Sequence, residues 1–153
     1  MGKYVLDEGI ESFEIEVKNR KKPIVLTFCP TDERLVQRFP QFFENVQNAI
    51  DNVKDVKADE FGNGETPSEI SALDKFKEIC ISEVDKLLDY EGNGEVLFNR
   101  CNPFRATKKG YWIEQVFYVL SDIIAENATS TMKHCELNLS ERGKKYANKY
   151  LKK

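Results

Sequence analysis

The sequence is poor in the residues from which metal sites and acid–base centres are most often built. It has one histidine, His134, and four cysteines that stand alone at positions 29, 80, 101 and 135. A zinc site needs several cysteine or histidine ligands at short spacings, and only the adjacent His134 and Cys135 come close to that pattern. Sequence neighbours rarely form the hydrogen bond that a cysteine–histidine nucleophile requires. We therefore expect no metal, no cofactor and no enzymatic activity.

Glycine-rich phosphate motifs and long apolar runs are also missing. Neither G-x-x-x-x-G-K-[ST] nor G-x-G-x-x-G occurs, which argues against nucleotide binding through such loops. The first residues, MGKYVLDEGIE, contain no apolar signal core, and the sixth residue is not the Ser or Thr of a myristoylation signal. These absences predict an intracellular protein with reduced thiols and no attachment to a membrane.

Charge is nearly balanced over the whole chain but basic at its end. A net charge of −3 gives no general reason to expect nucleic acid as a partner. The last dozen positions nevertheless gather six basic residues: Arg142, Lys144, Lys145, Lys149, Lys152 and Lys153. A solvated amphipathic tail helix explains this cluster, and a docking tail for an acidic partner or for RNA is the alternative.

What the sequence does have is amphipathic periodicity. Its 153 residues, 41% of them hydrophobic and 32% charged, suit one globular domain spanning residues 1–153. Within residues 12–29, large apolar residues alternate with others on both sides of a polar turn: Phe13, Ile15, Val17, Ile24, Leu26 and Phe28. This alternation predicts a β-hairpin. An isolated hairpin is marginally stable, so its apolar face must be covered by helices or by another subunit.

A first long helix is predicted over residues 31–57. Thr31 is the expected N-cap, with acidic residues after it that favour the positive helix end. Pro40 should kink the helix or restart it as a first-turn proline. A narrow stripe of this helix carries Phe39, Phe42, Phe43 and Val46. The stripe belongs either to the core or to a groove that binds a partner.

A second helix is predicted over residues 66–90 and has the most complete start signal in the chain. Thr66 is the N-cap, Pro67 occupies the first helical position and Glu69 the third. Apolar residues follow at helical spacing: Ile70, Leu73, Phe76, Ile79, Cys80, Val84, Leu87 and Leu88. The glycine-rich turn after Tyr90 is expected to end the helix.

We expect the chain to fold around a third helix, predicted over residues 109–127. One stripe of it carries seven large apolar side chains: Trp112, Ile113, Val116, Phe117, Leu120, Ile123 and Ile124. The opposite face is expected to be solvent-exposed: Glu114, Gln115, Ser121, Asp122 and Glu126. A last helix is predicted over residues 140–151. The predicted fold is mainly α (α+β), with an N-terminal β-hairpin packed on a bundle of three to four amphipathic helices.

Residues 89–100 look like part of an EF-hand calcium loop. Asp89, Glu91 and Asn93 supply oxygen side chains at positions one, three and five, and a glycine follows at position six. The twelfth position should be a bidentate glutamate but is Arg100, a cation. A helix-ending turn explains the same residues, and we expect no calcium site.

Features between residues 81 and 126 have the character of a family motif. An aspartate-bearing helix end, V-D-K-L-L at 84–88, leads to a Gly-x-Gly turn at Gly92 and Gly94 and to Phe98. A polar spacer, the amphipathic helix with Trp112 and a basic end containing tyrosines follow. In these features, and in its F-x-I-x-V strand at 13–17, the chain resembles the tail assembly chaperones of long-tailed (siphovirus-type) bacteriophages and prophages of Gram-positive bacteria. The family's turn more often reads acidic–aromatic–Gly–acidic–Gly followed by Thr or Ser, so E-G-N-G-E-V departs from it.

The resemblance implies a binding protein without catalysis. Such chaperones bind the tape-measure protein, a very long coiled chain, and keep it soluble while tail-tube subunits assemble around it. It implies the host bacterial cytoplasm as location and absence from the mature virion. The tail-tube protein and further copies of the same chain are additional candidate partners, and the sequence does not determine the oligomeric state. The expected contact surface joins the first-helix stripe to the third helix: Phe39, Phe42, Phe43, Val46, Trp112, Val116 and Phe117. The alternatives are a structural tail or connector protein that stays in the virion, a calcium-dependent regulator, and an RNA-binding regulator.

Overall fold

The structure, a computed structural model, describes residues 2–127. Its elements, in chain order, are β1 (Glu11–Ile15), β2 (Ile24–Phe28), α1 (Glu33–Asn52), α2 (Pro67–Leu88), α3 (Asn93–Phe98), β3 (Ala106–Thr107), β4 (Gly110–Tyr111) and α4 (Trp112–Asn127). The predicted helix over 140–151, the basic tail and the His134–Cys135 pair lie outside the described residues.

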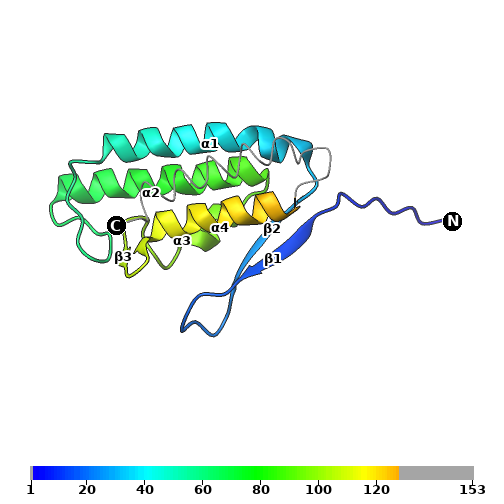
Figure 1. The fold of residues 1–153 in the computed structure, drawn as a ribbon, viewed down its shortest axis with the longest axis horizontal. Helices are drawn as coiled ribbons and strands as arrows, with labels where there is room; N and C mark the ends of the chain where they lie inside the picture. Colours follow the sequence, from blue (N-terminus) through cyan, green and yellow to red (C-terminus); the bar gives the residue numbers. More distant parts are fainter. Residues whose placement is uncertain (1, 128–153) are drawn as a thin grey trace.

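The prediction of a mainly α fold with an N-terminal hairpin on a helical bundle is confirmed (Figure 1). The three long helices α1, α2 and α4 run alongside one another, and the β1–β2 hairpin lies near one end of them (Figure 1). The short helix α3 contacts both α2 and β2, so it joins the hairpin to the bundle. Residues 2–10 run away from the hairpin as an extended segment, which we call the N-terminal arm (Figure 1).

The hairpin is antiparallel, with a register from Glu11 opposite Phe28 to Ile15 opposite Ile24. The inward side chains of β2 are buried, and Phe13 stacks on Phe28 with ring centroids 4.8 Å apart. Covering this face by the helices supplies the burial that two strands alone lack.

The outer edge of β2 is closed by a side chain. Asn93, the buried first residue of α3, accepts a hydrogen bond from the Thr27 N–H at 2.8 Å and donates one to the Thr27 carbonyl at 2.8 Å. One carboxamide thereby satisfies the backbone donor and acceptor that a third strand would otherwise take.

The N-cap of helix α1 lies one residue later than predicted. It is Asp32, whose carboxylate accepts a hydrogen bond from the Arg34 N–H at 3.0 Å, so the assignment of Thr31 was wrong. The helix continues through Pro40 without ending there. It stops at Asn52, five residues before the predicted end at 57, and Val53 is the C-cap.

Helix α2 starts as predicted. Thr66 accepts a hydrogen bond from the Glu69 N–H, and the Glu69 carboxylate accepts one from the Thr66 N–H, which completes the capping box. These bonds lower the pKa of Glu69 below its ordinary value, the Thr66 backbone N–H having the largest effect. The helix ends at Leu88, and the left-handed residue after it is Asp89 instead of a glycine.

Three short elements were not predicted. Helix α3 has only six residues, too few for helical periodicity to be recognised, and β3 and β4 have two residues each. Strand β4 occupies residues that the sequence assigned to the start of the third helix, so α4 begins at Trp112 instead of 109. Within residues 2–127, no helix is both long and apolar enough to cross a membrane.

The apolar stripe predicted on the third helix lies in the core. Six of its seven predicted apolar residues are buried and Ile123 is partly buried. The expected polar face was wrong at two positions, because Glu114 and Ser121 are buried. Glu114 lies in the first turn of α4, where its carboxylate accepts a hydrogen bond from the Tyr111 N–H at 3.2 Å, so a capping role accounts for its position there.

Candidate partner-binding site

The residues predicted to contact a partner lie mostly inside the core. Phe39, Phe42, Val46, Trp112, Val116 and Phe117 are buried, and Phe43 is partly buried. Phe117 packs against Phe39 and Phe42 with ring centroids 5.3 and 5.9 Å away. The Trp112 indole N–H donates to the Leu97 carbonyl at 2.8 Å. The structure therefore brings the two stripes together as core, and a partner could reach most of these side chains only if the helices separated.

The Gly-x-Gly turn of the family motif is a joint between α2 and α3. The Asp85 carboxylate accepts hydrogen bonds from the Gly94 N–H at 2.7 Å and the Gly92 N–H at 3.3 Å. Gly92 has a φ of 99°, which disfavours any side chain there. At Gly94 a Cβ would overlap the Ile81 carbonyl and come within 2.6 Å of the Ile81 Cα. Phe98, at the end of α3, is fully buried.

The same geometry shows how the EF-hand-like residues are used. Asn93, at the fifth position of the loop pattern, directs its carboxamide to β2 instead of into the loop. Asp89 and Glu91 are exposed, and the two glycine N–H groups bind Asp85 from the preceding helix. Among residues 2–127, no group of three His, Cys, Asp or Glu side chains is placed to hold a metal ion.

A different apolar surface remains open. Ile70 and Ile79 belong to the apolar pattern of the predicted second helix, but they are 44% and 42% exposed. They are nine residues apart, so at 100° per residue they point to opposite sides of the helix. Ile70 lines a pocket between the start of α2 and two loops, whereas Ile79 does not.

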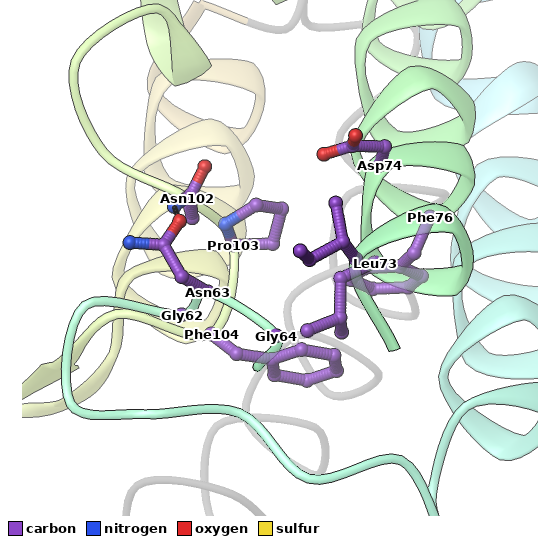
Figure 2. A pocket seen from close by; sticks show the side chains of 10 residues that line it. Gly62, Asn63, Gly64, Leu73, Asp74, Phe76, Asn102, Pro103 and Phe104 are labelled. Atoms are coloured by element: carbon purple, nitrogen blue, oxygen red, sulfur yellow. Dashed lines mark hydrogen bonds between the residues drawn. The ribbon is translucent and has the colours of Figure 1, made fainter. Parts of the chain in front are cut away.

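We call this hollow the end pocket. It has a volume of about 250 Å³ and is lined by Gly62, Asn63, Gly64, Ile70, Leu73, Asp74, Phe76, Asn102, Pro103 and Phe104. Figure 2 shows Leu73 reaching from α2 toward Pro103, with Phe104 below and the Asp74 carboxylate directed across the same space. The Phe76 and Phe104 rings stack 4.7 Å apart and make an aromatic wall.

The loop side of the end pocket is held by a hydrogen-bonded network. The Asp59 carboxylate accepts from the N–H groups of Phe61 and Asn63, both at 2.9 Å. Asn102 donates to the Phe61 carbonyl at 3.0 Å and to the Asn63 side chain at 2.8 Å. Gly62, with a φ of 80°, lets the loop pass close to Asn102 and Phe104. These contacts tie two loops about forty residues apart in the chain into one preformed wall.

The chemistry of the end pocket suits an apolar side chain from another protein. Its volume lies below the roughly 300–1,000 Å³ of typical small-molecule sites. Apolar walls with a rim of two asparagines and one carboxylate resemble the anchor pockets of protein interfaces. Sequence reasoning missed this site, because Ile70 and Phe76 look like ordinary core positions and the loops carry no motif.

Cys80 adds no reactive centre to this part of the molecule. Cys80 is buried, and burial raises the pKa of its thiol strongly, with the nearby Glu83 carboxylate raising it further. The thiolate is the nucleophilic form, so Cys80 remains an unreactive packing residue at neutral pH.

Comparisons of the chain with protein-family models, with curated proteins and with solved structures find no match. The resemblance to tail assembly chaperones therefore depends on the residues quoted for it and stays a prediction.

Proposed function

We propose that the protein is a tail assembly chaperone that binds an apolar helical segment of a phage tape-measure protein through its end pocket. The exposed Ile70 at the rim of the end pocket, together with the preformed walls of the pocket, is the observation that supports this proposal. A tape-measure chain exposes apolar stripes that would aggregate unless covered. The protein acts by covering them, without catalysis, in the host cytoplasm, and leaves before the virion is complete.

The pocket suggests how a client helix would be recognised. A leucine or phenylalanine on the client would insert between Leu73, Pro103 and Phe104, while Ile70 contacts the neighbouring turn. A lysine or arginine one helical turn away would reach the Asp74 carboxylate. Helix-in-groove recognition of this kind reads apolar anchors at three- and four-residue spacing.

Co-expression of the protein with the tape-measure protein of its own phage tests the proposal. We expect the wild type to move the tape-measure protein from the insoluble to the soluble fraction. Ile70→Asp should abolish this effect, because a carboxylate at the rim of an apolar pocket must be desolvated when a client binds. Absence of any effect by the wild type would contradict the proposed function.

Ile79→Asp is the matched control, since Ile79 has nearly the same exposure on the same helix but lies away from the pocket. It should solubilise the client as well as the wild type does. Equal loss in both variants would show that α2 tolerates no added charge or that another surface binds the client. Mass spectrometry of purified virions separates this function from that of a structural tail protein, which would stay in the particle.

A further inference from the structure

The N-terminal arm exposes three successive large apolar side chains. Tyr4, Val5 and Leu6 are 96%, 88% and 97% exposed, and the arm runs away from the rest of the molecule (Figure 1). Scattered exposed apolar residues are normal, but three adjacent ones on an extended segment make a surface suited to another protein.

The hairpin has an open edge along β1. Among the described residues the sheet has two strands, so the side of β1 away from β2 pairs with no strand. The backbone groups of Thr27 bind Asn93 and so point away from β1. Ser12 lies opposite Thr27, so its N–H and carbonyl point away from β2, and those of Glu14 follow two residues on. Ser12 and Glu14 thus present the donors and acceptors of the open edge.

We propose that the arm of one copy adds to the β1 edge of a second copy, so that the two copies form a symmetric dimer by arm exchange. Placing Leu6 opposite Phe13 and Tyr4 opposite Ile15 puts the apolar side chains of the arm beside those of β1. These would be non-hydrogen-bonded pairs, in which facing side chains lie closest. Ser12 and Glu14, whose backbone groups face the open edge, would form the hydrogen-bonded pairs.

The same register pairs opposite charges at one end of the arm and like charges, Glu8 opposite Glu11, at the other. It places Lys3 of the arm opposite Glu16 and Val5 opposite Glu14, on the outer face of the sheet. A shift by one residue would turn Tyr4 and Leu6 to the solvent side and would bring Lys3 out of line with Glu16.

Gly9 allows the arm and β1 to act as one continuous strand that is exchanged between the two copies. Tyr4 and Leu6 are at even positions, whereas Phe13 and Ile15 are at odd ones, so a regular strand would put the two pairs on opposite faces. Gly9 lies between them with a φ of 74°, the left-handed conformation of a glycine β-bulge. A bulge adds one residue to the alternation and brings both pairs to the same face, as a two-fold dimer requires.

Light scattering coupled to size-exclusion chromatography tests the proposal on the full chain. We expect a dimer for the wild type and a monomer for Leu6→Lys that still unfolds cooperatively, because Leu6 lies outside the core. Its melting temperature should be lower than that of the wild type only by the stabilisation that dimerisation supplies. Val5→Lys should remain a dimer, since Val5 faces Glu14 in the proposed register. A monomeric wild type, or a Leu6→Lys variant that still dimerises, would overturn the proposal.

A charge exchange tests the register. Lys3→Glu should weaken the dimer by up to about tenfold, since two exposed ion pairs are lost per dimer. Adding Glu16→Lys should restore the affinity, and failure to restore it would contradict this register. The inference is independent of the proposed function, because Leu6→Lys leaves the end pocket unaltered and should still solubilise a client.

Discussion

Asp32 shows how one carboxylate sets the start of α1. Its partial burial alone would raise its pKa, but the Arg34 N–H and the Arg38 guanidinium, 3.0 Å away, outweigh this effect and lower the pKa below the ordinary value of 3.8. A carboxyl whose pKa is lowered by folding stabilises the protein above its ordinary pKa. That stabilisation is lost as the pH falls through 3.8 and toward the lower folded value.

Asp32→Asn removes the negative charge but keeps the helix cap, because asparagine caps helices about as well as aspartate. At neutral pH we expect the free energy of unfolding to fall by about 0.5 kcal/mol, the size typical of a partly exposed ion pair. The difference from the wild type should vanish as the pH falls through 3.8, as followed by urea denaturation. Thr31→Ala should change nothing measurable, and an effect as large as that of Asp32→Asn would restore Thr31 as the cap.

At the scale of elements, the joint between α2 and α3 depends on how closely two backbones approach. Gly94→Ala inserts a methyl group against the Ile81 backbone, which cannot yield as a flexible side chain would. We expect a loss of about 3 kcal/mol in the free energy of unfolding, measured by urea denaturation.

Gly92→Ala is the companion variant, since no atom lies within 4 Å of its Cβ position and only the positive φ disfavours it. It should cost about 1 kcal/mol. Equal costs for the two variants would mean that backbone conformation, and not close packing of α3 on α2, explains the Gly-x-Gly turn.

The elements also show which signals sequence reasoning can use. The Thr66–Glu69 capping box and the alternation of the hairpin are local patterns, and both were predicted from neighbouring residues. The bond between Asn93 and Thr27 joins positions 66 residues apart, and no pattern within either segment indicates it. The six residues of α3 are too few to show a period. Glu114 is buried, and its carboxylate accepts a hydrogen bond from the Tyr111 N–H just before α4. Helical periodicity alone places Glu114 on the polar face and gives no sign of this bond.

For the whole molecule, the candidate site could not be predicted because exposure is a tertiary property. Ile70 and Ile79 belong to the same apolar pattern as Leu73 and Cys80, and only the packing of loops and helices around α2 leaves them open. On isolated helices the aromatic stripes of α1 and α4 would look like contact surfaces. In the structure they pack against one another and are buried. The end pocket arises where loops 58–65 and 99–105 meet the first turns of α2.

The most direct test of the account is photo-crosslinking of a client at this surface. A photoreactive amino acid placed at position 70 or at position 79 would be irradiated in cells that co-express the tape-measure protein. The account predicts a covalent adduct with the tape-measure protein from position 70 and little or none from position 79. Adducts formed equally from both positions, or none from position 70 while the client remains soluble, would contradict binding through the end pocket.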